Sequence, residues 1–201
     1  MNSGSGKTKE VRLFGSLKVM AISALLLAMS IICGKYLAIP GGHVLRFSFE
    51  NLPILLGGMM FGPLLGMVIG VGADLIGCLI VGYSVNPLVT LGAAAVGLVG
   101  GGLYRLCRRL PAFWRTLISV VGGHLIGSVG IKTFGLAIYY QMPIWELMLW
   151  RLLNYLIVGA VEFFLIWLIL RNRAVQANLN GLHADLASHR KSGEHEKQSK
   201  E

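Results

Sequence analysis

Four ionisable residues lie inside stretches of sequence that are otherwise apolar enough to cross a membrane: Asp74, Lys132, Arg151 and Glu162. A charged side chain near the centre of a bilayer costs about 3 kcal/mol on insertion scales unless protein, water or a ligand compensates it. Two of the four are acidic and two are basic. They could therefore pair with one another, or they could line a wet cavity that accepts a ligand.

The depth of these residues favours a ligand site. Lys132 and Arg151 should lie on the order of 10 Å below the outer ends of their segments, at the rise of an α-helix. Asp74 and Glu162 fall nearer the middle of theirs. Two cations above two acids would suit a ligand with one anionic end and one hydrogen-bonding end.

The last apolar segment has a polar face. Arg151, Tyr155 and Glu162 recur at helical spacing, and Asn154 borders them. We expect this face to point into a helical bundle.

The elements that must position these side chains are apolar segments. We expect membrane helices over residues 17–39, 52–61, 64–81, 87–104, 116–138 and 144–170. The second is too short to cross as a regular helix and is expected to be a short or tilted span. The predicted fold is an all-α bundle of six transmembrane helices over residues 16–171. A cytoplasmic tail (1–15) precedes it, and a polar, disordered tail (172–201) follows.

Small residues recur beside Asp74. Gly58, Gly62, Gly66 and Gly70 stand four apart, and Asp74 takes the next step of the series. This spacing lets helix backbones approach closely in lipid. A packing seam that leads to a buried acid indicates a site.

Composition identifies the class of protein. Of the 201 residues 55% are hydrophobic and 13% are charged, against about 25% charged in soluble domains. The net charge of +9 does not indicate nucleic-acid binding, because fourteen of the eighteen Lys and Arg residues lie in the two tails, in residues 105–115, or at Lys18 and Arg171 beside the tails. Basic residues gather on the cytoplasmic side of membrane proteins, so both termini are predicted to lie in the cytoplasm, with the chain in the plasma membrane.

Other chemistries are poorly supported. Residues 4–8 match only half of a phosphate-binding loop, so the chain is not expected to hydrolyse ATP itself. Three cysteines and the scattered histidines show no metal-ligand spacing, and no cofactor is expected. An intramembrane enzyme using Asp74 and Glu162 is an alternative, although no protease or hydrolase motif accompanies them. A self-sufficient transporter would favour internal repeats, and none is evident.

One long stretch carries a family resemblance. Its motifs are Arg46 to Pro53 (RFSFENLP), Gly58, Phe61-Gly62-Pro63, Gly66, Gly70, Ala73 to Gly77 (ADLIG) and Asn86-Pro87. Residues 16–172 resemble the substrate-binding S components of energy-coupling factor (ECF) vitamin transporters, and the folate branch in particular. Another vitamin or a precursor remains an alternative substrate.

The resemblance implies a six-helix protein with an outward-facing vitamin site, which works with a transmembrane coupling subunit and two cytoplasmic ATPases. Ala24 and Ala28 match the family's coupling motif in the first helix, with Ala21 on the same face. Arg46, Asn86 and Tyr139 lie in or beside loops that close the family's site.

These arguments predict ten substrate-binding residues: Arg46, Phe49, Asp74, Asn86, Lys132, Thr133, Tyr139, Arg151, Asn154 and Tyr155. Lys132, Arg151 and Arg46 are expected to hold the acidic end of a vitamin such as folate. Asp74 and Asn154 are expected to bind its ring.

Overall fold

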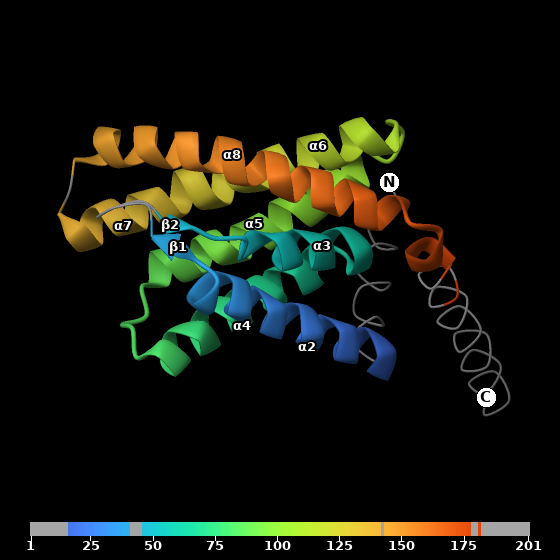
Figure 1. The fold of residues 1–201 in the computed structure, drawn as a ribbon, viewed down its shortest axis with the longest axis horizontal. Helices are drawn as coiled ribbons and strands as arrows, with labels where there is room; N and C mark the ends of the chain where they lie inside the picture. The colour runs from blue at the N-terminus through green and yellow to red at the C-terminus, as the bar shows by residue number, and fades with distance from the viewer. Residues whose placement is uncertain (1–15, 41–45, 142, 178–180, 182–201) are drawn as a thin grey trace, which may run out of the picture.

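The protein is an elongated bundle of helices (Figure 1). The computed structural model describes residues 16–40, 46–141, 143–177 and 181. Its elements are α2 (Leu17–Ile31), η1 (Ile32–Tyr36), β1 (Ile39–Pro40), β2 (Arg46–Phe47), α3 (Asn51–Phe61), α4 (Pro63–Val81), α5 (Pro87–Leu106), α6 (Ala112–Gly123), η2 (His124–Ile131), α7 (Lys132–Tyr140) and α8 (Ile144–Arg171). The elements η1 and η2 are π-helical: η1 extends α2, and η2 joins α6 to α7 without a break.

Local sequence explains where several helices begin and end. Pro63 and Pro87 occupy first helical positions, where the missing proline N–H costs no hydrogen bond. Asn86 caps α5, since its side-chain oxygen accepts from the Leu88 N–H at 3.0 Å. Gly62 (φ 115°) separates α3 from α4, and Gly82 (φ 74°) ends α4 in the left-handed conformation.

The all-helical prediction is confirmed, apart from a ladder of two residues per strand in which Ile39 faces Phe47. Within the described ranges, five helical stretches are long and apolar enough to cross a membrane, and α3, with 11 residues, is shorter. Figure 1 shows the start of α2, the α5–α6 connection and the end of α8 at the same right-hand end of the bundle. The disorder expected for the C-terminal tail concerns residues that lie mostly outside the described ranges.

The short helix α3 starts inside the bundle. Figure 1 shows it beginning partway along the bundle, with β1 and β2 leading into it from the left. Asn51, its first residue, is fully buried. The polar start of this helix is thus brought into an apolar interior, where its side chains need partners.

Glycines let α3, α4 and α5 cross at close range. A Cβ at Gly66 would lie 2.6 Å from Gly58 Cα, and one at Gly58 would lie 2.7 Å from the Gly97 carbonyl oxygen. The predicted close-packed seam therefore exists, but it does not run along one helix, as a regular four-residue spacing would suggest. Gly62 is the break between α3 and α4, so the seam joins different helices instead of following one helix face.

Candidate functional site

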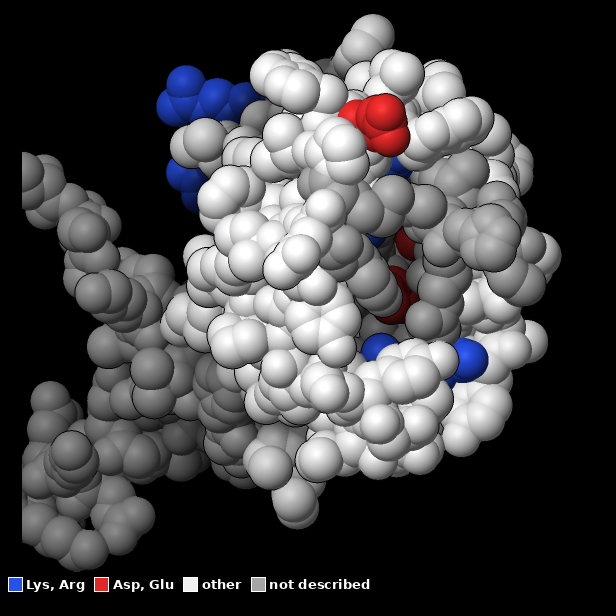
Figure 2. All heavy atoms as spheres, turned by 90° about the vertical axis from the view of Figure 1, so that its left-hand side faces the viewer, with Lys and Arg blue, Asp and Glu red and all other residues white. Residues whose placement is uncertain are grey.

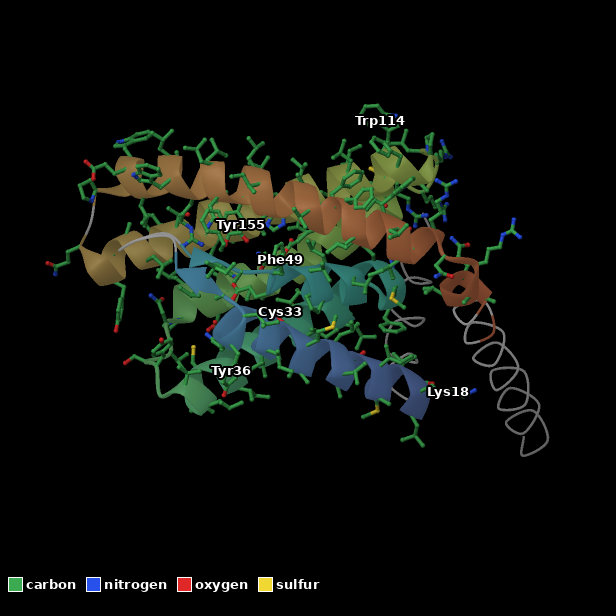
Figure 3. All side chains as sticks on the ribbon, viewed as in Figure 1. Lys18, Cys33, Tyr36, Phe49, Trp114 and Tyr155 are labelled. Carbon is green, nitrogen blue, oxygen red and sulfur yellow. The ribbon has the colours of Figure 1, made fainter. Side chains whose placement is uncertain are left out.

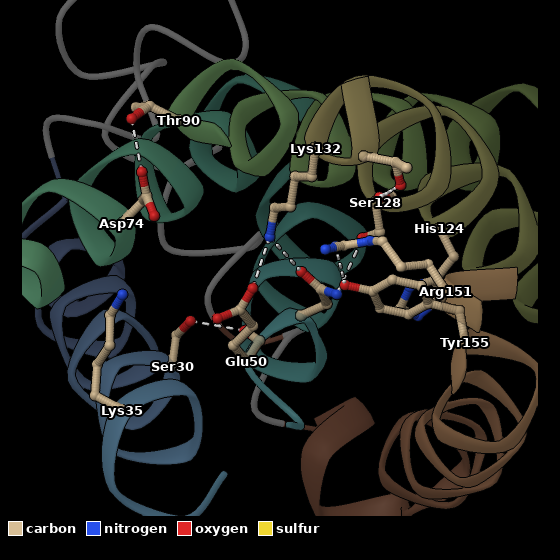
Figure 4. A network of polar contacts seen from close by, with 12 residues as sticks. Ser30, Lys35, Glu50, Asp74, Thr90, His124, Ser128, Lys132, Arg151 and Tyr155 are labelled. Atoms are coloured by element: carbon tan, nitrogen blue, oxygen red, sulfur yellow. Dashed lines mark hydrogen bonds and ion pairs between the residues drawn. The ribbon is translucent and has the colours of Figure 1, made fainter. Parts of the chain in front are cut away.

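A buried ion pair lies at the centre of the bundle. Lys132, the first residue of α7, donates from Nζ to Glu50 Oε1 at 2.7 Å and to Asn51 Oδ1 at 3.3 Å. Only 4% of the Lys132 side chain is exposed, against 29% for Glu50. Ser30 on α2 donates to the Glu50 backbone carbonyl at 2.7 Å. The turn before α3 is therefore tied to two other helices (Figure 4).

The π-helix η2 extends this network. Asn51 Nδ2 donates to Ser128 Oγ at 3.2 Å, and Thr133 Oγ1 donates to the Ser128 carbonyl oxygen at 3.2 Å. The wider turn of a π-helix frees backbone acceptors and redirects side chains, and such segments often mark functional sites. Here it ends immediately before Lys132.

Asp74 lies on the α4 side of this network. Thr90 on α5 donates from Oγ1 to Asp74 Oδ2 at 2.6 Å. Cys78 Sγ lies 4.0 Å from Asp74 Oδ1 and 3.7 Å from Lys35 Nζ. The Lys35 side chain crosses Gly77, where a Cβ would lie 2.7 Å from Lys35 Cε. Asp74 is therefore compensated by a hydroxyl and lies close to a cation from η1.

These groups line a narrow cavity between the helices. Its walls include Ser30, Gly34, Lys35, Glu50, Gly70, Asp74, Ala93 and Lys132. Figure 2 looks onto the left-hand end of Figure 1 and shows a hollow with acidic atoms at its bottom and basic atoms beside it. The cavity measures about 10 Å³, close to the space that one water needs. Side chains thus occupy most of the interior.

A second polar group lies on α8. Arg151 donates from Nη2 to the Tyr155 hydroxyl at 3.1 Å. Its Nε is buried and has no hydrogen-bond partner within the described part of the chain. Glu162 Oε2 and His124 Nε2 are joined by a hydrogen bond of 2.7 Å. In Figure 4, Arg151 and Asp74 lie on opposite sides of the Lys132–Glu50 pair.

The remaining predicted residues are spread along the bundle. Asn86 donates to the Gly135 carbonyl oxygen at 3.1 Å, and Asn154 is buried on α8. Tyr139 is mostly exposed near the end of α7. Phe49 packs against the hydrophobic core, and Figure 3 shows it in the middle of the bundle. Arg46 is in β2, and its side chain lies outside the described part of the structure.

The alternative that the four intramembrane charges pair with one another is not what the structure shows. Each has a partner outside that set: Asp74 with Thr90, Lys132 with Glu50, Arg151 with Tyr155, and Glu162 with His124. The separate partners of Asp74 and Glu162 also give no support to an enzyme that uses both. Within the described ranges, no group of three or more His, Cys, Asp or Glu side chains could hold a metal ion.

Sequence reasoning missed Glu50, Asn51 and His124. Glu50 lies just outside the predicted helix 52–61, but a signal for it exists: a helix too short to cross must leave one end, and its flanking residues, inside the membrane. His124 offered no spacing signal, because its partner Glu162 lies 38 residues further along the chain.

The fold and site define a helical membrane protein that encloses a polar site between its spans. Residues 18–171 match the family described as "ECF transporter, substrate-specific component". The chain therefore belongs to the substrate-specific components of ECF transporters, as the motifs around Asn51-Leu52-Pro53 and Asp74 predicted.

Two relatives refine the comparison. The chain is 34% identical over 62 residues to the folate transporter FolT of Clostridium novyi (strain NT), and this aligned part spans 31% of the chain and 36% of that relative. A crystal structure of FolT bound with folic acid superposes with a TM-score of 0.62 at 22% identity. That match covers 76% of this chain and 92% of the other, so the two share a fold.

Proposed function

We propose that this chain is the subunit that captures folate, or a closely related vitamin, for uptake across the plasma membrane. The observation that carries the proposal is the half-buried Arg151, whose Nε is buried and has no hydrogen-bond partner in the described structure, beside an internal carboxylate–ammonium pair. Folate combines an acidic glutamate end with a flat ring that carries both donors and acceptors. One relative is named as a folate transporter and the other was solved with folic acid bound, which supports this substrate.

The geometry favours a particular orientation of the ligand. Lys132 is already neutralised by Glu50, whereas Arg151 retains an unused donor, so Arg151 is the better group for the acidic end. Arginine binds a carboxylate through two parallel donors. Arg46, from the first loop, is proposed to assist it.

The ring end of the ligand is then proposed to bind the Lys132–Glu50 pair. A carboxylate beside an ammonium presents an acceptor next to a donor, which complements a ring edge that carries N–H groups beside a carbonyl. We therefore move Lys132 from the acid end to the ring end and add Glu50 there, with Asp74 beyond them. Phe49 supplies an apolar ring close to this position.

Binding must rearrange the central pair. The cavity of about 10 Å³ cannot admit a vitamin while the Lys132 and Glu50 side chains fill it. Both side chains must turn toward the ligand, which replaces the contact between them. Asn86, Thr133, Tyr139, Asn154 and Tyr155 are proposed to complete the wall of the enlarged site.

The assembly follows from family membership. We propose that a transmembrane coupling subunit and two cytoplasmic ATPases complete the transporter. Ala21, Ala24 and Ala28 on α2 are all exposed in the isolated chain, and a row of small residues lets a partner helix approach closely. With α3 as a short sixth pass, both termini are proposed to be cytoplasmic.

Ligand titration tests the function and the orientation together. The purified protein in detergent should bind folate tightly, as measured by calorimetry. Arg151→Ala should weaken folate binding by about 2 to 5 kcal/mol if the contact is desolvated. It should leave binding of pteroate, which lacks the glutamate, nearly unchanged.

Arg109→Ala, in the exposed α5–α6 connection, is the matched control and should change neither affinity. If the unmodified protein binds a different vitamin and not folate, the proposed substrate is wrong. Equal losses of folate and pteroate in Arg151→Ala would instead show that the orientation is wrong.

A further inference from the structure

The pair of His124 and Glu162 has no role in the site described so far. His124 opens η2 and Glu162 lies in the middle of α8, and both side chains are buried, Glu162 completely. Their contact of 2.7 Å joins residues 38 positions apart. A buried ionisable residue in a membrane span is a functional hypothesis by default, because it is costly to retain.

Packing around the pair is incomplete. An open groove of about 260 Å³ lies between α6, η2 and α8, and its lining is almost wholly apolar. Its walls include Val121, Leu125, Leu152, Leu156 and Phe163, with His124, Tyr155 and Gly159 between them. Where side chains do not interdigitate, they do little to set the position of a helix. The polar contact between His124 and Glu162 is therefore a specific link between η2 and α8 at this level.

A chain of contacts leads from the pair to the ligand site. The His124 ring lies 5.0 Å from the Tyr155 ring, centroid to centroid, with an interplanar angle of 33°. Such tilted, offset contacts between rings are attractive. The Tyr155 hydroxyl accepts from Arg151, whose guanidinium also lies 5.4 Å from the centre of the Tyr155 ring. Figure 4 shows His124, Arg151 and Tyr155 together on the right of the Lys132–Glu50 pair.

We propose that His124 and Glu162 are positioning residues: they hold Tyr155, and through it Arg151, in the orientation that binds the acidic end of the ligand. The inference rests on the proposed function, because it assumes that Arg151 contacts that end. It makes affinity for the acid depend on two residues that never touch the ligand.

A double-mutant cycle tests the proposal. Glu162→Ala should weaken folate binding by about ten- to a hundredfold, the range expected when a hydrogen bond to a charged group is lost. Pteroate binding should change much less. In an Arg151→Ala background, Glu162→Ala should cause no further loss, because the residue through which it acts is already gone.

Two further variants separate positioning from general destabilisation. Ile166→Ala removes a fully buried side chain one turn further along α8. It should lower thermal stability while leaving the ratio of folate to pteroate affinity unchanged. His124→Gln can still bond to Glu162 but removes the ring beside Tyr155, so it should weaken folate selectively even if Glu162→Ala does not fold.

The outcomes distinguish the two proposals. If the unmodified protein does not bind folate, the proposed function fails. If Arg151→Ala weakens folate binding but Glu162→Ala and His124→Gln do not, the positioning role is overturned and the function stands. Additive losses in the double variant, or equal losses of folate and pteroate, would also overturn the positioning role.

Discussion

The Lys132–Glu50 pair predicts an unequal response to the removal of its two partners. Removing one member of a fully buried ion pair costs about 3 to 5 kcal/mol, because the other charge is left uncompensated. The Lys132 side chain is only 4% exposed, whereas the Glu50 side chain is 29% exposed. Glu50→Gln leaves the buried Lys132 ammonium without its carboxylate partner. Lys132→Met leaves the Glu50 carboxylate unpaired, but water can reach that group. The first variant should therefore be the less stable.

The magnitudes follow from that difference in exposure. Gln keeps an acceptor and Asn51 Oδ1 stays near Lys132 Nζ, so we expect Glu50→Gln to cost about 2 to 4 kcal/mol. Lys132→Met should cost about 1 kcal/mol, since an apolar side chain of similar size replaces it. A chain of this length loses about 2 to 4 °C per kcal/mol, so the two Tm values should differ by several degrees.

Thermal unfolding in detergent, followed by a thiol-reactive dye or by size exclusion, measures these differences. The double variant Glu50→Gln/Lys132→Met should be more stable than Glu50→Gln alone, because no charge is then stranded. Glu146→Gln, an exposed carboxylate in the first turn of α8, is the control and should leave Tm unchanged. A larger loss for Lys132→Met than for Glu50→Gln, or additive losses in the double variant, would refute the reasoning.

Three further predictions concern assembly, topology and packing. Ala28→Trp should leave ligand binding intact but abolish uptake by the reconstituted transporter, because bulk on the exposed face of α2 blocks a partner helix; normal uptake would argue against this docking face. In a cysteine-free background, Ser84→Cys should react with an impermeant reagent from outside and Arg109→Cys should not, and the reverse pattern would invert the topology. Gly97→Ala should lower Tm, since its Cβ would collide with the Gly66 backbone, whereas Gly102→Ala, with open space around it, should not; equal effects would contradict the glycine seam.

Much of the fold could be read from local patterns. Apolar length predicted the long helices to within a few residues, and the prolines at positions 63 and 87 marked two helix starts. The four-residue spacing of glycine predicted a close-packed seam. These features depend on neighbours in the chain, so a sequence pattern records them directly. The intramembrane charges likewise indicated a polar interior, although their partners could not be identified from the sequence.

The partners of those charges were decided by the tertiary structure. Glu50 and Lys132 are 82 residues apart, and the contact arises because the 11-residue helix α3 begins inside the bundle. Two π-helical segments, which no spacing rule predicted, then redirect the side chains around them. The sequence alone determined that several buried charges need compensation, because desolvation is a property of each residue and its span. Which group compensates each charge depends on how distant helices cross, and only the folded bundle determines that.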